Sequence, residues 1–353
     1  FRIPKKLFTE NRIGEKISLF RGRNEVDEAH FVALKSKELI ENGTLPDQIA
    51  VLYRANFQSR VLEDAFVAYG VPYQMLGTKF FERKEVKDVM SLIKASLSGE
   101  SLSDFGRVVN VPPRGIGKVT LQKIAAEKEG ELPESTKIKI NNFRKMLLTF
   151  RAKLTTDKPS QALKHIIKVS GMEEMYRTGR EEDTERLENI MELVTIATSY
   201  DVFPAEEGIE KFLSDTALAS DQDFMVDGDP SSRAKLATGQ GKNGVKLLTV
   251  HSSKGLEFDY VFIAGLEADL FPHKGMGSMK KSGEDGEEER RLFYVALTRA
   301  GKKLFLTHAE TRTIFGTMEV NSPSEFLDDI PEKYLETESY SGVVSKPIFS
   351  IEF

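Results

Sequence analysis

The stretch best suited to binding chemistry is Thr249-Val-His-Ser-Ser-Lys-Gly-Leu-Glu-Phe258, which directly follows an apolar run that predicts a buried strand. In open α/β sheets, ligands bind at the carboxyl ends of the strands, so this stretch lies where a site is expected. Its hydroxyl groups and Lys254 could hold phosphates, and Glu257 could accept hydrogen bonds from sugar hydroxyls. A polar loop in this position is about as often an ordinary solvated connection, and the residues alone leave both interpretations open.

A second stretch, Glu287-Glu-Glu-Arg-Arg-Leu-Phe-Tyr-Val-Ala-Leu-Thr-Arg-Ala300, predicts a charged helix. The Glu residues at its start favour the positive N-terminal end of the helix dipole. Arg299 stands at the opposite end, where a guanidinium either caps the last carbonyls or points at a phosphate of a partner. The helix alone favours the capping role.

The elements that must position these residues alternate short β-branched runs with helical patterns, which is typical of a parallel sheet with crossover helices. Up to about residue 80, the strands are expected at 17–20, 49–54 and 72–76, and the helices at 25–42 and 59–69. After residue 244 the pattern returns, with strands expected at 245–250, 260–266 and 303–308 and the helix at 287–300.

Between these two parts, helical periodicity dominates and no convincing strand is found. Helices are predicted near 85–97, 104–110, 120–129, 134–154, 160–169, 184–200 and 208–219. The segment 221–244 is rich in turn-forming residues and predicts a mobile linker, and the Gly-rich segment 274–286 predicts a second one. The simplest organisation is one α/β domain interrupted by an inserted helical domain.

Composition limits the function classes. The 353 residues predict about two domains, and 40% hydrophobic with 30% charged residues is the balance of a soluble globular protein. The sequence has no Cys and five scattered His, so disulfides and thiolate sites are excluded and no metal site is predicted. The formal net charge is −5, so contacts with nucleic acid must come from local basic patches. The lack of Cys and of a signal-like first segment favours the cytoplasm.

The two chemical stretches, followed in order by Ala309-Glu-Thr-Arg-Thr-Ile-Phe-Gly316, closely resemble the fifth and sixth motifs of the UvrD/PcrA/Rep family of superfamily 1A DNA helicases. Ala50-Val-Leu-Tyr-Arg-Ala-Asn-Phe-Gln-Ser-Arg-Val-Leu-Glu63 and Phe80-Phe-Glu-Arg-Lys-Glu-Val-Lys-Asp88 are similar to the second motor domain of that family, where it leads into an inserted domain. Asn110-Val-Pro-Pro-Arg-Gly-Ile-Gly-Lys118 is similar to the Gly-Ile-Gly element of the insert. The resemblance covers nearly the whole chain.

The resemblance implies an α/β fold: a RecA-like parallel sheet of the P-loop NTPase type (domain 2A), interrupted by an all-helical insert (domain 2B). The expected parts are 2A at 1–84 and 245–335, 2B at 85–220, a flexible linker at 221–244 and a C-terminal tail at 336–353. In this family a first RecA-like domain holds the other half of the ATP site. The sequence contains no Gly-x-x-x-x-Gly-Lys-Ser/Thr and no acidic Walker B strand, so the chain alone is not expected to hydrolyse ATP with Mg²⁺.

The resemblance also implies roles for individual residues. Arg299 matches the motif-six Arg that contacts the γ-phosphate, and Glu257 matches the acid that binds the ribose, with Gly255 in the same ATP-binding loop. The residues matched to contacts with single-stranded DNA are Arg54, Asn56, Thr249, His251, Ser252 and Phe315. Those matched to duplex contacts in the insert are Arg114, Gly115, Gly117 and Lys118. Read without the family, Phe315 could be a core aromatic and the Gly-Ile-Gly element a plain turn between helices.

The expected function is therefore the C-terminal part of an ATP-dependent 3′–5′ DNA helicase in repair or replication. Its expected partners are single-stranded DNA, a duplex junction, the N-terminal RecA-like domain, and repair or replication proteins. One alternative is a catalytically silent DNA-binding or protein-docking module, which Glu257 and Arg299 disfavour. Another is a helicase–nuclease subunit of the RecB/AddA type, but nothing after Phe326 suggests a metal-binding carboxylate cluster.

Overall fold

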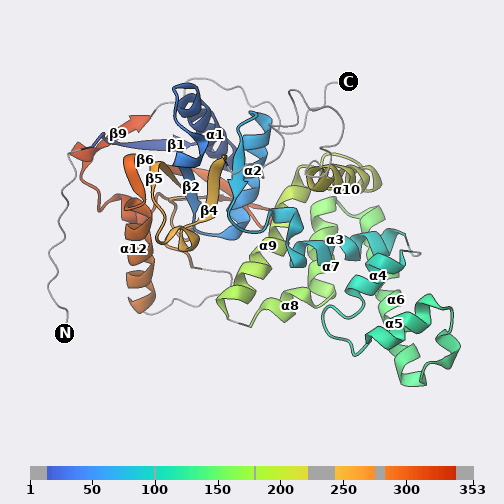
Figure 1. The fold of residues 1–353 in the computed structure, drawn as a ribbon. Helices are drawn as coiled ribbons and strands as arrows, with labels where there is room; N and C mark the ends of the chain where they lie inside the picture. Colours follow the sequence, from blue (N-terminus) through green and yellow to red (C-terminus); the bar gives the residue numbers. More distant parts are fainter. Residues whose placement is uncertain (1–13, 99–100, 179, 222–242, 275–282, 339–353) are drawn as a thin grey trace.

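A computed structural model describes residues 14–98, 101–178, 180–221, 243–274 and 283–338. The chain forms a unit built on a parallel sheet and a helical unit inserted between two of its strands (Figure 1). The linker predicted at 221–244 lies almost entirely outside the described residues, as does most of the segment predicted to be mobile at 274–286. Within the described part of the chain, no helix is long and apolar enough to cross a membrane.

The sheet has seven strands in the order β3-β4-β2-β5-β6-β1-β9, and every pairing is parallel. The strands are β1 (Ile17–Gly22), β2 (Ile49–Tyr53), β3 (Tyr73–Met75), β4 (Val245–Thr249), β5 (Phe258–Ala264), β6 (Ala300–Ala309) and β9 (Leu335–Glu338). Each strand predicted from the sequence is present. The predicted α/β class with a parallel sheet and a helical insert is therefore confirmed.

Alternate residues of the strands face two different cores. On one face, Phe20, Val51 and Phe262 pack with helices α1 (Glu25–Glu41) and α2 (Ser59–Ala68). On the other face, residues such as Leu52 pack with α12 (Gly283–Leu297). Because β2 is buried over its whole length, the sequence shows it as a continuous apolar run.

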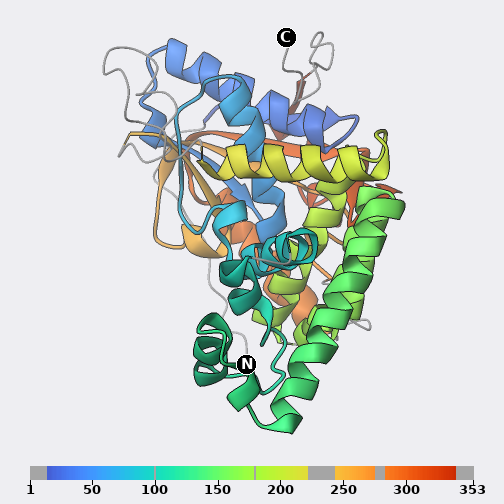
Figure 2. The same ribbon diagram turned by 90° about the vertical axis from the view of Figure 1, so that its right-hand side faces the viewer.

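The inserted unit, between β3 and β4, is helical throughout its described residues. Its helices are α3 (Lys84–Leu97), α4 (Leu102–Val108), α5 (Lys118–Ala125), α6 (Glu134–Thr156), α7 (Pro159–Val169), α8 (Met172–Tyr176), α9 (Glu181–Thr198) and α10 (Ala205–Asp221). They share one hydrophobic core, in which Phe150, Ile166 and Phe212 are fully buried. Figure 2 shows the long α6 running along one side of this unit, while Figure 1 places α9 next to the sheet.

Several short elements were not expected from the sequence. β7 (Thr311–Ile314) and β8 (Thr317–Val320) form an antiparallel hairpin. β9 pairs with β1, so the segment expected to be a tail from residue 336 begins instead as an edge strand of the sheet. The Ser18 hydroxyl of β1 donates to Glu336 and Glu338 of this strand. Short 3₁₀ turns occur at Pro46–Gln48, Asn56–Gln58, Phe80–Glu82, Glu129–Glu131, His251–Ser253, Glu325–Leu327 and Glu332–Tyr334.

The helix predicted at 287–300 is shifted toward the N-terminus. It begins at Gly283, inside the segment predicted to be mobile, and β6 already begins at Ala300. The interior Gly286 costs only about 1 kcal/mol of helix stability. Burial of Phe293 and Ala296 against the sheet outweighs that cost.

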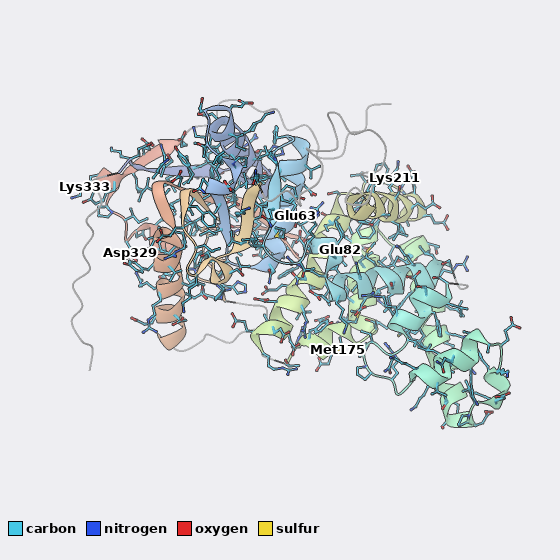
Figure 3. The ribbon with its side chains drawn as sticks, viewed as in Figure 1. Glu63, Glu82, Met175, Lys211, Asp329 and Lys333 are labelled. Atoms are coloured by element: carbon cyan, nitrogen blue, oxygen red, sulfur yellow. The ribbon has the colours of Figure 1, made fainter. Side chains whose placement is uncertain are left out.

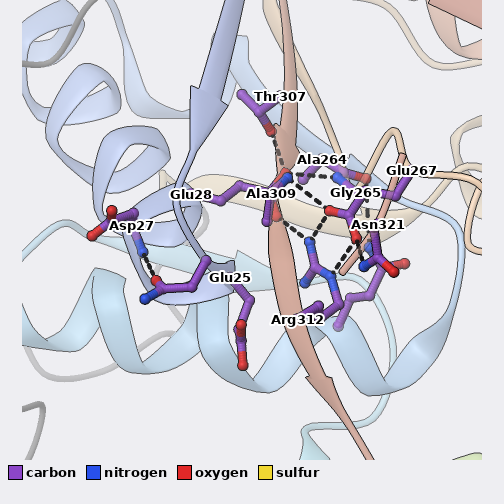
Figure 4. Close-up of polar contacts among 12 residues, drawn as sticks. Glu25, Asp27, Glu28, Ala264, Gly265, Glu267, Thr307, Ala309, Arg312 and Asn321 are labelled. Atoms are coloured by element: carbon purple, nitrogen blue, oxygen red, sulfur yellow. Dashed lines mark hydrogen bonds and ion pairs between the residues drawn. The ribbon is translucent and has the colours of Figure 1, made fainter. Parts of the chain in front are cut away.

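A buried ionic cluster connects α1, the loop that follows β5, and β7, which are the segments that follow β1, β5 and β6 (Figure 4). Arg312 donates to Glu28 at 2.6 Å and to Glu267 at 2.6 and 2.9 Å, and all three residues are at most 3% exposed. Glu28 also accepts from the Gly265 amide, and Glu267 from the Ala309 amide. Burial by itself would raise the pKa of Glu267, but Arg312 and the hydrogen bonds from the Ala309 amide and the Asn321 side chain hold it below its ordinary value.

The two units meet through polar groups on α2, on α9 and just before α3. Figure 3 labels Glu63 on α2 and Glu82 just before α3 near this junction. Arg83 donates to Asn189 at 2.6 Å and to Ser59 at 3.2 Å. Glu192 of α9 is buried here, and this burial raises the pKa of Glu192 to about 8, although Arg60 and Thr195 oppose the shift.

Replacing Arg312 by Met should lower the free energy of unfolding by about 3–5 kcal/mol, because two buried carboxylates lose their counter-charge. Denaturant titration of the variant measures this change. The control is Arg21→Met, which removes the solvent-exposed pair of Arg21 with Glu310 and should cost less than about 1 kcal/mol. An equal loss of unfolding free energy in the two variants would contradict the prediction that the buried cluster stabilises the fold more than the exposed pair does.

Stability should fall as the pH rises from 5 to 8, in part because of Glu192. Its carboxyl is protonated in the folded state up to a pKa of about 8 but ionises in the unfolded chain near 4.5, so the unfolded state holds fewer protons in between. Glu192→Gln should weaken this pH dependence, which urea titrations at pH 5 and pH 8 measure as the difference in the free energy of unfolding. Glu182→Gln, at an exposed position of the same helix, should leave the dependence intact. An unchanged slope in Glu192→Gln would disprove the assignment.

Candidate nucleotide and DNA site

The loop after β4 is folded by its own hydrogen bonds. The Val250 amide donates to the Tyr53 carbonyl at 2.9 Å, which fixes this loop to the end of β2. The Ser253 hydroxyl turns inward and donates to the Val250 carbonyl at 2.7 Å, whereas the Thr249 and Ser252 hydroxyls lie 3.0 Å apart on the exposed side. Gly255 has φ +84°, a conformation that favours glycine and that turns the chain toward β5.

Arg299 lies against the second half of this loop. Its Nη1 donates to the Leu256 carbonyl at 2.7 Å, its Nε to the Val295 carbonyl at 3.0 Å, and its Nη2 to the Thr298 hydroxyl at 3.0 Å. Glu257 is exposed beside this contact. The fold therefore brings together the proposed ATP-binding residues Gly255, Glu257 and Arg299.

These contacts are compatible with both interpretations of Arg299, as a cap of the helix C-terminus and as a cation for a phosphate. The bond to Val295 is the capping contact expected at a helix C-terminus. All three acceptors are neutral, no carboxylate among the described residues forms an ion pair with Arg299, and the guanidinium is only partly buried. An anion that approaches Glu257 and Leu256 would therefore meet an available cation.

A cleft of about 520 Å³ opens at the carboxyl ends of β2, β3 and β4. Its sheet-side wall includes the predicted DNA-binding residues Asn56, Thr249, His251 and Ser252. Its opposite wall comes from α9. The remaining lining residues are Tyr53, Met75, Leu76, Gly77, Thr78, Arg83, Glu181, Glu182 and Glu185. The cleft thus lies between the sheet unit and the insert.

The two walls differ in charge. The sheet side presents hydroxyls and His251, whose pKa is lowered by burial and by the nearby Arg54. The α9 side presents Glu181 and Glu185, and burial with the neighbouring Glu181 raises the pKa of Glu185. The Asn56 amide bridges the cleft by donating to Glu185 at 2.9 Å.

Arg54 does not point into the cleft. It is 7% exposed, and its guanidinium is held by Glu289 of α12 with bonds of 2.7, 3.0 and 3.1 Å. This buried ion pair occupies Nε and Nη2 of Arg54, the donors with which it could bind a phosphate in a bidentate manner. Arg54 therefore supports the loop beside the cleft in the described structure.

Phe315 lies at the tip of the β7–β8 hairpin. Phe315 and Gly316 have φ of +53° and +78°, as a tight hairpin turn requires. The Phe315 ring is 5.7 Å from that of Phe57 and packs against the core of the insert. The Gly316 amide donates to Thr195 of α9 at 3.1 Å. Phe315 thus makes packing contacts in the described structure, and its contact with a DNA base stays a prediction.

The Gly-Ile-Gly element lies on the inserted unit, near α5 at the end remote from the sheet (Figure 1). Arg114 donates to the carbonyls of Val111 and Ser170, each at 2.8 Å, and its guanidinium stacks over Phe143, so it holds the loop together. Gly115 has φ +70°, which explains the requirement for glycine. Gly115, Gly117 and Lys118 are exposed. The structure does not bring this element to the cleft.

Two features of the site were missed by sequence reasoning. The pairing of Glu289 with Arg54 joins residues 235 positions apart, and no local pattern signals it. The acidic wall from α9 was visible only as a run of charged residues at a helix start, which normally indicates dipole compensation. Among the described residues, no group of three or more His, Asp or Glu is placed to hold a metal ion.

Comparison with known proteins agrees with this arrangement. The family model for the UvrD-like helicase C-terminal domain matches residues 2–311. The chain is 36% identical to the ATP-dependent DNA helicase PcrA of Bacillus subtilis (strain 168), over 95% of this chain and 46% of the relative. It is 36% identical to PcrA of Staphylococcus aureus (strain MRSA252), over 96% and 47%, and 37% identical to DNA helicase II of Salmonella typhimurium, over 98% and 49%.

The chain therefore spans about half the length of the curated relatives that it matches. The matched family model covers most of the chain, including the β4 loop and α12. The chain belongs to the UvrD-like helicase C-terminal domain family.

Proposed function

We propose that this chain is the second motor domain, with its insert, of an ATP-dependent DNA helicase that moves 3′ to 5′ on single-stranded DNA during repair or replication. The observation that carries the proposal is the contact of 2.7 Å between Arg299 and the Leu256 carbonyl, beside the exposed Glu257. This contact places a cation and a carboxylate together at the amino ends of β5 and β6, where the two groups could contact the phosphates and the ribose of one nucleotide. The relatives named above are ATP-dependent or DNA helicases.

The residues fit a nucleotide shared with a first RecA-like domain. ATP with Mg²⁺ supplies the phosphoryl group and part of the positive charge that its transfer needs. Glu257 accepts hydrogen bonds from the ribose hydroxyls. Arg299 exchanges one or more of its neutral acceptors for phosphate oxygens and stabilises the charge that develops there. Gly255 lets the loop turn closely past the nucleotide.

The cleft is the proposed track for single-stranded DNA. Thr249, Ser252 and Asn56 offer hydroxyl and amide donors for phosphate oxygens, and such contacts are independent of sequence. His251 adds a further donor. The acidic wall of α9 repels the backbone, which keeps the phosphates on the sheet side and favours a weakly held strand. Gly115, Gly117 and Lys118 are proposed to contact the duplex ahead of the junction.

A catalytically silent docking module is the second candidate. It is favoured by the three local acceptors of Arg299, which give this side chain a structural role without any nucleotide. The two functions differ in whether Arg299 is needed for turnover, so one substitution separates them.

When the chain is combined with a first motor domain, as in the relatives, Arg299→Ala should lower DNA-stimulated ATP hydrolysis by at least about 1,000-fold, because charge on the transferred group loses its stabilisation. Arg299→Lys should recover only part of the rate, since it keeps the charge without the planar fork. Arg291→Ala, on the same helix and paired at the surface with Glu288, is the matched control. Full activity of Arg299→Ala would favour the docking module.

Removing both hydroxyls of the β4 loop, in Thr249→Val with Ser252→Ala, should weaken binding of a single-stranded oligonucleotide by about tenfold, as expected from losing about two hydrogen bonds to phosphate. Fluorescence anisotropy over a salt series measures the affinity. Lys118→Ala should leave this affinity unchanged but weaken binding of a duplex junction and reduce its salt slope by about one. Equal losses on both substrates in either variant would refute this division of contacts.

A further inference from the structure

The ion pair of Arg54 and Glu289 connects the wall of the cleft to the helix that leads to Arg299. Arg54 directly follows β2, between the cleft-lining residues Tyr53 and Asn56. Glu289 lies eight residues before the end of α12 at Leu297, and Arg299 follows that end by two residues. Both side chains of the pair are nearly buried, at 8% and 12% exposure. Movement of the loop is therefore transmitted to α12.

Glu289 has a second partner, His273, which connects it to the loop after β5. Its Oε2 accepts from the His273 amide at 3.0 Å, and the His273 ring lies 3.0 Å from the buried Glu188 of α9. Arg54 also lies 3.6 Å from Glu181, at the start of α9. Glu289 thus stands where contacts from the β2 loop, the loop after β5 and the insert converge.

The geometry of the Arg54–Glu289 pair couples displacements of the β2 loop and α12 more strongly than apolar packing would. Glu289 takes both Nε and Nη2 of Arg54, so the two groups are fixed in orientation as well as in distance. Separation would leave both charges buried without a partner. The pair therefore resists small displacements of the β2 loop relative to α12 and makes the two elements move together.

We propose that Glu289 is a positioning residue that couples occupation of the DNA cleft to the placement of Arg299. This inference rests on the proposed function, because it assumes that the cleft binds DNA and that Arg299 acts on ATP. DNA in the cleft would fix the β2 loop, the loop would hold Glu289 through Arg54, and α12 would present Arg299 in one orientation. Glu289 itself contacts neither substrate.

The test uses Glu289→Gln in the protein that also carries the first motor domain. Glutamine keeps the size and one acceptor but removes the charge that fixes Arg54. The ratio of ATP hydrolysis with saturating single-stranded DNA to hydrolysis without DNA should fall at least about fivefold, while the DNA-free rate stays within about twofold. By reciprocity, a non-hydrolysable ATP analogue should also lose its effect on the DNA dissociation constant.

Glu288→Gln is the matched control, because Glu288 is the adjacent residue of α12 but is exposed and pairs with Arg291. It should keep the wild-type ratio. Glu289→Asp, which keeps the charge, should give an intermediate ratio, and it provides the test if Glu289→Gln does not fold. A wild-type ratio in Glu289→Gln, or a parallel fall of both rates, overturns the inference. A wild-type protein whose ATP hydrolysis does not respond to DNA would instead refute the proposed function.

Discussion

The buried cluster of Arg312, Glu28 and Glu267 fixes the carboxyl edge of the sheet, where the cleft opens. Glu28 belongs to α1, Glu267 to the loop after β5, and Arg312 to β7, so one guanidinium binds residues from three segments that are distant in sequence. Loss of Arg312 would leave two buried carboxylates without their counter-charge. Gln58 continues this arrangement, because its side chain accepts from the Arg54 and Ala55 amides at the end of β2. Buried polar contacts therefore connect the carboxyl ends of β1, β2, β5 and β6.

The site divides into two halves that lie at opposite edges of the sheet and differ in charge. The half near Arg299 keeps a cation with no ion-pair partner among the described residues, which suits an anionic ligand held at one place. The cleft half places neutral donors opposite Glu181 and Glu185, so its attraction for phosphates is weakened. A motor must release its track in every cycle, whereas it must hold the nucleotide until the phosphoryl group has been transferred. The two charge patterns agree with these different tasks.

The sheet and the insert could be predicted because their residues report local burial. β2 and β4 are buried apolar runs, and the helices of the insert show regular periodicity. β8 is exposed at every residue, and β9 is a short edge strand with Glu at alternate positions, so neither shows a strand pattern. Family likeness identified the loop of Glu257 and the position of Arg299. It did not reveal that Arg54 is buried against Glu289, because that contact depends on tertiary structure alone.

Arg299 illustrates why a structural and a functional role need not exclude each other. The carbonyls at the end of α12 and the Leu256 carbonyl hold its guanidinium in one orientation beside Glu257. An arginine without these contacts would sample many rotamers and would lose that freedom on binding a phosphate. Exchange of neutral acceptors for phosphate oxygens retains the position and strengthens the hydrogen bonds. The capping contacts would thus prepare the side chain for the proposed stabilisation of a transition state, which depends on dipoles and charges that are already oriented.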